Sequence, residues 1–275
     1  METDAFDERL MKSLLQTEHI GSRLFCLSQV DSTNEELKRR FMAEEDLPHG
    51  TVAITGDQRA GKGRRGRSWV TPPGANIAMS IMLRPEIDPD LASMLTLPMA
   101  LAVSRACSEK TGFSCQIKWP NDVVINGKKI CGILTEMSVG RRDETSKIDY
   151  VIVGVGVNVN TPSFPEDISA TAISLKLACG HGFDKNEVAA LILTHFEKLY
   201  NEFLECGDLG FMTDEYNALL VSREKAVRVL DPKGEYEGVS LGINDKGELL
   251  VRLSDGSTVA VYAGEVSVRG IYGYV

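Results

Sequence analysis

The sequence predicts an α/β domain followed by a small β domain. In residues 1–221, short apolar runs typical of strands alternate with longer stretches whose apolar residues recur at helical spacing. After residue 222 the pattern changes to five short β segments separated by tight turns, which is typical of a small barrel. A length of 275 residues is sufficient for one large and one small domain. We therefore expect one domain over residues 1–221 and a second over residues 222–275.

Hydrophobic periodicity and turn residues place the individual elements. In the first domain we expect helices at residues 5–18, from residue 32 onward, at 89–111 and over 184–220. Strands of this domain are expected at residues 24–27, 51–55, 76–83, 116–118, 123–125, 130–137 and 150–159. The five strands of the second domain are expected at residues 225–230, 236–243, 248–253, 258–262 and 265–269.

Three local signals refine this picture. Ser32 and Glu35 have the spacing of a capping box, in which each side chain bonds the other residue's backbone N–H at a helix start. Asn126-Gly127 is a strong signal for a type I′ hairpin turn between two of the strands. Residues 57–75 lack apolar periodicity and are rich in glycine, so we expect a long loop there, and long loops are usually functional or disordered.

Composition excludes several classes of protein. The net charge of −9 disfavours binding of the whole molecule to nucleic acid or to anionic membranes. No stretch approaches the roughly 20 apolar residues of a membrane span, and the acidic start, residues 1–10, is unlike a secretory signal. The six cysteines form no Cys-x-x-Cys pair, so we expect buried reduced thiols and no metal site. A cytoplasmic location follows as the expectation.

The expected loop carries a dense basic cluster in this acidic chain. Five cations fall within nine residues, and no acid occurs from residue 58 to residue 85; the cations are Arg59, Lys62, Arg64, Arg65 and Arg67. The intervening glycines let the backbone approach an anion closely. The segment is not a Walker A loop, because no Gly-Lys is followed by Ser or Thr. A phosphate-binding loop, a nucleic-acid patch and a merely solvated loop all remain open on this evidence.

Two further segments carry chemically useful side chains. Lys118 ends an apolar strand, where its ammonium group needs an anionic partner or a lowered pKa. An ion pair with Asp122 or Glu136 would satisfy it, as would a carboxylate or phosphate that changes charge during a reaction. The segment 31–34, Asp-Ser-Thr-Asn, caps a helix and also leaves polar groups beside the helix N-terminus, which suits a polar ligand.

Taken together, these segments resemble the biotin–protein ligase family. Five landmarks occur in the family's order between Phe25 and Arg269, and they cover nearly the whole chain. They are Asp-Ser-Thr-Asn at 31–34, Gln-x-Ala-Gly-Lys-Gly-Arg-Arg-Gly-Arg-x-Trp at 58–69, Lys-Trp-Pro-Asn-Asp at 118–122, Lys-x-x-Gly-Ile-Leu-x-Glu at 129–136 and Gly-Val-Gly-Val-Asn-x-Asn at 154–160. The resemblance implies an α/β (α+β) catalytic domain with a mixed sheet flanked by helices, followed by an SH3-like barrel.

The resemblance also implies roles for individual residues. Positions that match the family's biotin site are Ser32, Thr33, Asn34, Gln58, Lys62, Gly63, Arg64, Lys118 and Gly132. Positions that match its ATP and adenylate site are Arg64, Arg67, Trp69, Lys118 and Asn158. Lys118 and Arg64 match catalytic positions, and Trp69 would stack on adenine. Many relatives have arginine where this chain has Lys62, and a lysine cannot make a bidentate contact.

The implied activity is the ATP-dependent formation of biotinyl-5′-AMP, followed by transfer of biotin to a lysine of a biotin carboxyl carrier domain. ATP and biotin would be the substrates, with Mg²⁺ bound to the phosphates. Only 24 residues precede the matched region, so we expect a form without the N-terminal DNA-binding domain of some relatives. A homodimer is also expected. The alternatives are a lipoate–protein ligase of the same fold and a non-catalytic nucleic-acid-binding protein; the motifs at 61–67 and 118–122 favour biotin over lipoate.

Overall fold

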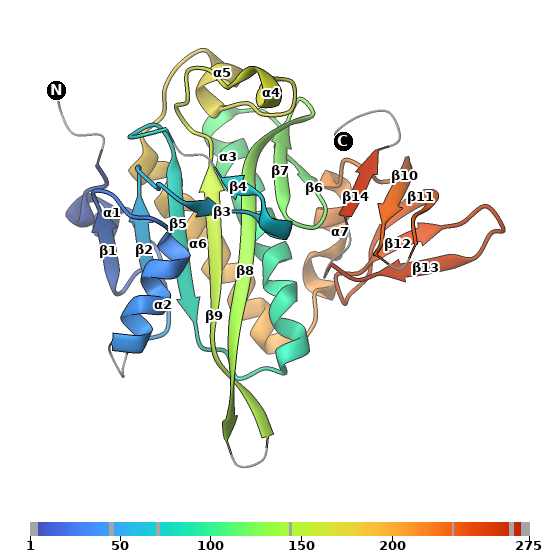
Figure 1. The fold of residues 1–275 in the computed structure, drawn as a ribbon, viewed down its shortest axis with the longest axis horizontal. Coiled ribbons are helices and arrows are strands. Elements are labelled where there is room, and N and C mark those ends of the chain that lie inside the picture. Colours follow the sequence, from blue (N-terminus) through green and yellow to red (C-terminus); the bar gives the residue numbers. More distant parts are fainter. Residues whose placement is uncertain are drawn as a thin grey trace.

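A seven-stranded mixed sheet organises the first part of the computed structural model, which describes residues 5–43, 47–69, 72–142, 145–232, 234–263 and 267–270. The strand order is β1-β2-β5-β9-β8-β7-β6 (Figure 1). The pair β1–β2 is parallel and every other neighbouring pair is antiparallel. The strands are β1 (Leu24–Leu27), β2 (Thr51–Thr55), β5 (Ile77–Leu83), β6 (Gln116–Lys118), β7 (Asp122–Ile125), β8 (Lys128–Arg142) and β9 (Thr145–Val157). The predicted mixed sheet is confirmed.

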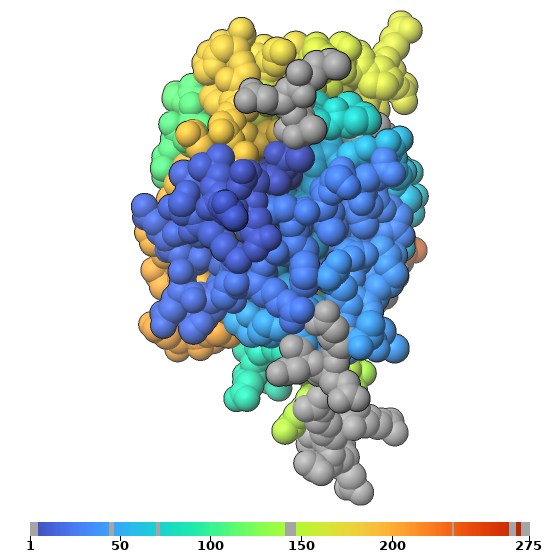
Figure 2. Space-filling model, turned by 90° about the vertical axis from the view of Figure 1, so that its left-hand side faces the viewer, coloured from blue at the N-terminus to red at the C-terminus, as the bar shows by residue number. Residues whose placement is uncertain are grey.

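Helices cover both faces of this sheet. On one face α3 (Thr96–Thr111) and α6 (Lys185–Cys206) pack on each other and enclose the main core. On the other face α2 (Thr33–Ala43) covers a smaller cluster that includes Leu37, Met82 and Ile152. The N-terminal α1 (Glu8–Leu14) rests on α6, and in Figure 2 the N-terminal segment is the dark blue surface that faces the viewer. The sheet is therefore flanked by helices, as predicted.

The expected helix at 89–111 consists of two parts. Pro89–Leu95 forms the 3₁₀ segment η2, and α3 follows it from Thr96. Contrary to the expectation from the sequence, the combined segment is long and apolar enough to cross a membrane, but most of it is buried inside the molecule. It is the central core helix of a globular domain, which explains why its apolar residues extend around most of its circumference.

The second domain is a five-stranded antiparallel sheet of order β13-β12-β11-β10-β14. Its strands are β10 (Ala226–Leu230), β11 (Tyr236–Ile243), β12 (Leu249–Arg252), β13 (Thr258–Val261) and β14 (Ser267–Gly270). Several hydrogen bonds join it to the first domain, and two of them lie near Lys118 and η2. The indole Nε1 of Trp119 donates to the carbonyl of Gly247 at 3.1 Å, and the hydroxyls of Ser93 and Tyr262 are 2.6 Å apart. The C-terminal sheet therefore borders the turn that follows Lys118.

Several local expectations need correction. Residues 57–75 contain a small hairpin, β3 (Gly61–Lys62) and β4 (Ser68–Trp69), around the 3₁₀ turn η1 (Arg64–Gly66). The helical region 184–220 is divided at Gly207, where α6 ends, and α7 (Gly210–Leu219) follows. The sequence reading missed α4 (Glu166–Ser169) and α5 (Leu175–Cys179). All six cysteines are free thiols, but only Cys107, Cys115 and Cys131 are buried as predicted, while Cys26 and Cys179 are partly buried and Cys206 is exposed.

Candidate active site

A pocket opens on the sheet face that carries α2, beyond the N-terminal end of that helix. In the registers of β5, β8 and β9, the cross-strand partners Gly132 and Gly156 lie opposite each other, as do Leu134 and Gly154. Opposite residues in antiparallel strands share a face, so at Gly132, Gly154 and Gly156 this face of the sheet presents bare main chain beside the side chain of Leu134. The pocket is lined by Ser32, Thr33, Asn34, Gln58, Lys62, Gly63, Trp69, Ala78, Met79, Asn121, Lys129, Gly132, Ile133, Leu134, Gly154, Val155 and Gly156.

One wall of the pocket is polar and buried. Ser32, Thr33 and Asn34 form the start of α2 and are at most 5% exposed. The backbone N–H of Thr33 donates to Gln58 Oε1 at 2.9 Å, which fixes the carbonyl end of the Gln58 amide against the helix. The structure therefore brings together four of the residues that the resemblance assigned to biotin.

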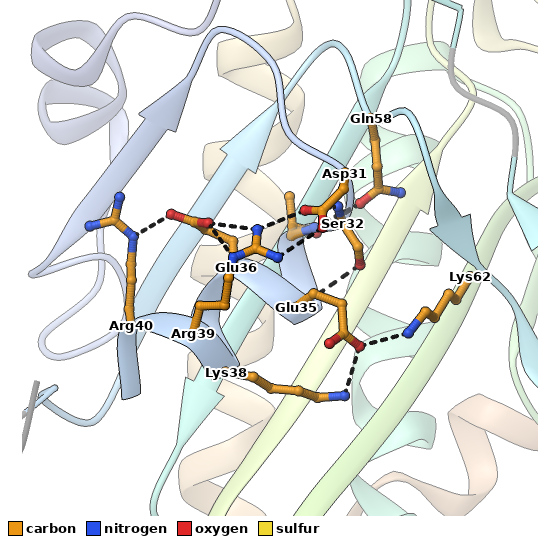
Figure 3. A network of polar contacts seen from close by, with 10 residues as sticks. Asp31, Ser32, Glu35, Glu36, Lys38, Arg39, Arg40, Gln58 and Lys62 are labelled. Carbon is orange, nitrogen blue, oxygen red and sulfur yellow. Dashed lines mark hydrogen bonds and ion pairs between the residues drawn. The ribbon is translucent and has the colours of Figure 1, made fainter. Parts of the chain in front are cut away.

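Only one of the two hydrogen bonds of the capping box predicted at Ser32 and Glu35 is formed. Ser32 Oγ does accept the N–H of Glu35, at 3.5 Å, but the Glu35 carboxylate does not return to Ser32. It instead accepts from Lys38 at 3.0 Å and from Lys62 at 2.8 Å (Figure 3). The Ser32 N–H donates to Asp31 Oδ1 at 2.7 Å. The helix starts where predicted, but Glu35 is used for ion pairing with the loop.

The β3–β4 hairpin carries Trp69 onto the glycine floor. A Cβ at Gly156 would collide with the Trp69 indole, and a Cβ at Gly132 would lie 3.1 Å from its Cζ3. The ammonium of Lys129 lies 5.5 Å from the ring centroid, within the range of a cation–π contact. Trp69 Nε1 is buried and has no hydrogen-bond partner among the described residues. The absence of side chains on the floor is therefore what allows a large aromatic ring to lie inside the pocket.

Arg64 extends from the loop to the second domain. Its guanidinium donates to Asn121 Oδ1 at 3.0 Å and to the carbonyl of Ala263 at 2.7 Å. It lines a second cavity, next to the first, with Ser93, Thr96 and Thr135. Burial is the main cause that lowers the pKa of Arg64, followed by the opposing effect of Asp122. Arg64 thus holds the glycine-rich loop against both domains.

Lys118 lies at the end of β6 beside a group of cations. Burial lowers its pKa to about 8; Asp122 acts in the opposite direction, and Lys129, Arg269 and Arg67 lower the pKa further. Asp122 forms an ion pair with Lys129 at 2.6 Å. The surplus of positive charge in a partly dehydrated place favours binding of an anion such as a carboxylate or a phosphate.

Some predicted residues lie outside the main pocket. Lys118 is not among the residues that line it, and Arg67 is exposed. Asn158 is buried below the site, where its Oδ1 lies 3.3 Å from Nδ2 of Asn76. Two lining residues, Asn121 and Lys129, received no role from the sequence, although both lie inside landmarks. Arg269 was also missed, because no local pattern connects β14 to β6.

Comparisons with known proteins agree on one family. Residues 26–158 match the model of the biotin/lipoate A/B protein ligase family, and residues 224–269 match the biotin protein ligase C-terminal domain. The chain is 32% identical to the biotin–[acetyl-CoA-carboxylase] ligase of Mycobacterium tuberculosis, covering 94% of both chains. It is 35% identical to the bifunctional ligase/repressor BirA of Bacillus subtilis, covering 92% of this chain and 76% of BirA.

A solved structure gives the same result in three dimensions. The biotin protein ligase from Aquifex aeolicus in complex with biotin and ATP aligns with a TM-score of 0.79 and 30% identity, covering 90% of this chain and 99% of the other. A polar pocket beside a cationic cluster, on a mixed sheet, suits an enzyme that activates a carboxylic acid with a nucleotide. The chain belongs to the biotin–protein ligase family.

Proposed function

We propose that this chain is an ATP-dependent biotin–protein ligase, which forms biotinyl-5′-AMP and then transfers biotin to a lysine of a carrier protein. The observation that carries the proposal is the position of the polar pocket next to Lys118 and its neighbouring cations. The pocket can hold a neutral polar ring, while the cations receive a carboxylate and a phosphate. Similarity to biotin ligases along more than nine-tenths of the chain supports this reading.

The residues divide between the two substrates. Biotin contacts are assigned to Ser32, Thr33, Asn34, Gln58, Lys62, Gly63, Arg64, Lys118 and Gly132. ATP and adenylate contacts are assigned to Arg64, Arg67, Trp69, Lys118 and Asn158. The roles of Arg67 and Asn158 require them to approach the nucleotide when it binds, because neither lines the pocket. The ion pair of Lys62 with Glu35 gives that lysine a partner in place of the bidentate contact of an arginine.

In the first step two anions must meet. The biotin carboxylate attacks the α-phosphate of ATP and displaces pyrophosphate, so neutralisation of charge is the main catalytic demand. Lys118, held at the end of β6, offers an ammonium that can contact both the carboxylate and a phosphate oxygen. Arg64 and Arg67 would receive the remaining phosphate charge. Mg²⁺ enters with ATP as part of the nucleotide substrate. An ion of this kind is usually held mainly by the phosphates, with few protein ligands.

In the second step the adenylate must be protected from water until the acceptor amine arrives. The β3–β4 hairpin supports this role, because Lys62 fixes it to α2 and Arg64 fixes it to Asn121 and to the second domain. The ligand phosphate would add a further attachment point for the cations of this loop.

We further propose the setting in which the enzyme works. The acceptor is a biotin carboxyl carrier domain of acetyl-CoA carboxylase or a related carboxylase, in the cytoplasm, without a membrane or nucleic-acid partner. The net charge of −9 supports the last point. We propose a homodimer that forms through an edge of the sheet. Strand β7 pairs with β8 only as far as Gly132, and among the described residues no strand pairs with that side of β8 beyond Gly132. A domain boundary near residue 221 separates α7 from β10.

The direct test is ATP-dependent transfer of labelled biotin to an isolated biotin carboxyl carrier domain. We expect transfer with biotin and none with lipoate, because the match to a biotin-specific C-terminal domain favours biotin. Isothermal titration with each acid separates the two ligands at the binding step. Transfer of lipoate, without transfer of biotin, would instead establish the lipoate alternative.

The pKa of Lys118 predicts a pH dependence of the first step. Since that pKa is about 8, the ammonium form predominates below this pH and is lost above it. The kcat/KM of adenylate formation, which reports the free enzyme, is expected to be flat from pH 7 to 7.5 and to fall about tenfold per pH unit well above 8. Pyrophosphate exchange measures this step without the acceptor amine. A profile that stays flat to pH 9.5 would contradict the role of Lys118.

A further inference from the structure

A chain of short polar contacts runs behind the biotin pocket and ends at its wall. Nδ2 of Asn34 donates to Glu136 Oε2 at 2.6 Å. Oδ1 of Asn34 lies 2.5 Å from Ser80 Oγ, which lies 2.6 Å from Thr33 Oγ1. Neither Glu136 nor Ser80 lines the pocket, whereas Asn34 and Thr33 do. The chain therefore connects a carboxylate outside the pocket to a hydroxyl on its surface.

Glu136 forms an ion pair with a lysine of α2. Lys38 lies 2.8 Å from Glu136 Oε1 and also pairs with Glu35 at 3.0 Å. Figure 3 shows Lys38 and Lys62 converging on the Glu35 carboxylate. An ionised carboxylate can only accept hydrogen bonds. Glu136 must therefore face the NH₂ end of the Asn34 amide, which turns the oxygen of that amide toward Ser80.

The number of available protons determines the direction of the remaining hydrogen bonds. The Asn34 oxygen accepts only, so the single proton of Ser80 is needed there, and a second lone pair at 2.5 Å would be repulsive. Ser80 Oγ lies in donor geometry toward Thr33 Oγ1 as well, but a hydroxyl has one proton, so with that proton on Asn34 the 2.6 Å contact needs the proton of Thr33. The other acceptor near Thr33 Oγ1 is Gln58 Oε1, but it is farther away, at 3.2 Å, and already accepts the Thr33 N–H. Thr33 therefore has no proton left for the pocket.

We propose that Glu136 is a positioning residue that sets the direction of this hydrogen-bond chain, so that Thr33 acts toward the ligand only as an acceptor. The adjacent Gln58 amide directs its NH₂ end away from Thr33, because its oxygen is fixed by the Thr33 N–H. The wall then offers an acceptor, the Thr33 hydroxyl, next to a donor, the NH₂ group of Gln58. This pattern matches the N–H and C=O of a cyclic urea. The inference rests on the proposed binding of biotin in this pocket.

The floor of the sheet supports the fixed orientation of Asn34. A Cβ at Gly154 would collide with Asn34 Oδ1, so the missing side chain leaves room for the amide between β9 and α2. Asn34 and Ser80 are 5% and 0% exposed. Water therefore has little access to supply an alternative proton to the chain.

The test is the isosteric substitution Glu136→Gln. A glutamine can donate to the Asn34 oxygen, so the amide can reverse, Ser80 can donate to Thr33, and Thr33 regains a proton directed at the ligand. We expect the KM and Kd for biotin to rise about five- to tenfold, the effect of about one hydrogen bond, with the KM for ATP unchanged within twofold. Steady-state kinetics and isothermal titration measure these values.

Two further variants distinguish an effect of hydrogen-bond direction from an effect of charge near the pocket. Lys38→Met removes the lysine but keeps the carboxylate on Asn34, so the KM for biotin is expected to stay within twofold of the wild type. Ser80→Ala interrupts the chain and should raise that KM as Glu136→Gln does. Because both act through one chain, the double variant should be no worse than either single variant. If Glu136→Gln does not fold, the effect of Ser80→Ala decides alone.

The inference is overturned if Glu136→Gln leaves the KM for biotin within twofold, if it raises the KM values for biotin and ATP equally, or if the effects of Glu136→Gln and Ser80→Ala multiply. Each of these results is obtained with an enzyme whose wild type transfers biotin. Failure of the wild type to transfer biotin would instead reject the proposed function, so the two failures are distinguishable.

Discussion

Replacing Lys118 with alanine is expected to abolish adenylate formation. The substitution removes the ammonium that neutralises the reacting carboxylate and phosphate, and loss of one preorganised charged group costs about 3 kcal/mol, roughly a hundredfold in rate. The neighbouring Lys129 does not replace it, because its ammonium is already paired with Asp122 at 2.6 Å. Release of pyrophosphate from ATP in the presence of biotin measures this step directly.

The matched control is Lys246→Ala, which removes the same charge from an exposed turn of the second domain. It should release pyrophosphate at the wild-type rate. The assignment of Lys118 fails if Lys118→Ala does so as well. If Lys118→Ala still binds biotin in a titration, its pocket is folded and the loss of activity arises in the reaction step.

The second large effect is expected at Arg64. Arg64→Gly removes the hydrogen bonds to Asn121 and to the carbonyl of Ala263, so the loop keeps its ion pair with α2 through Lys62 but loses these contacts with Asn121 and the second domain. We expect the adenylate to form but to dissociate at least about tenfold faster, since two hydrogen bonds from a charged group are lost. Retention of labelled adenylate on the protein in a filter-binding assay measures this escape.

The neighbouring residue provides the control for this experiment. Arg65 carries the same charge in the same turn, is exposed, and has a positive φ of 58° that glycine adopts without strain. Arg65→Gly should therefore retain the adenylate as the wild type does. If Arg64→Gly retains the adenylate as well as the wild type does, the role of Arg64 is contradicted. If Arg64→Gly and Arg65→Gly lose the adenylate equally, the effect comes from the charge of the loop alone.

Much of the fold could be predicted because local and tertiary preferences agree. The β-branched run Thr51–Thr55 forms β2 with the expected bounds, and Asn126-Gly127 adopts the two positive φ angles of the predicted hairpin turn. The small α4 and α5 were missed because four or five residues contain too little periodicity to reveal a helix. Similarly, β8 and β9 extend beyond their predicted ends into a long projecting hairpin (Figure 1).

Part of the candidate site was also predictable from the sequence, and part was not. Ser32, Thr33, Asn34 and Gln58 converge as their motifs suggested, because each motif lies at the end of an element that borders the pocket. The ion pair between Glu35 and Lys62 joins residues 27 positions apart, and the proximity of Arg269 to Lys118 depends on how the second domain packs. Such contacts are set by tertiary structure, so spacing along one chain gives no signal for them.

The glycine floor has a consequence for attempts to alter what this enzyme accepts. At Gly132, Gly154 and Gly156 the wall of the pocket is main chain, so any replacement adds atoms against Trp69, Lys129 or Asn34. Enlarging the cavity for bulkier carboxylic acids therefore cannot begin at the sheet backbone. Leu134, which lines the pocket beside these glycines, is the position where shortening a side chain creates space without disturbing the polar wall.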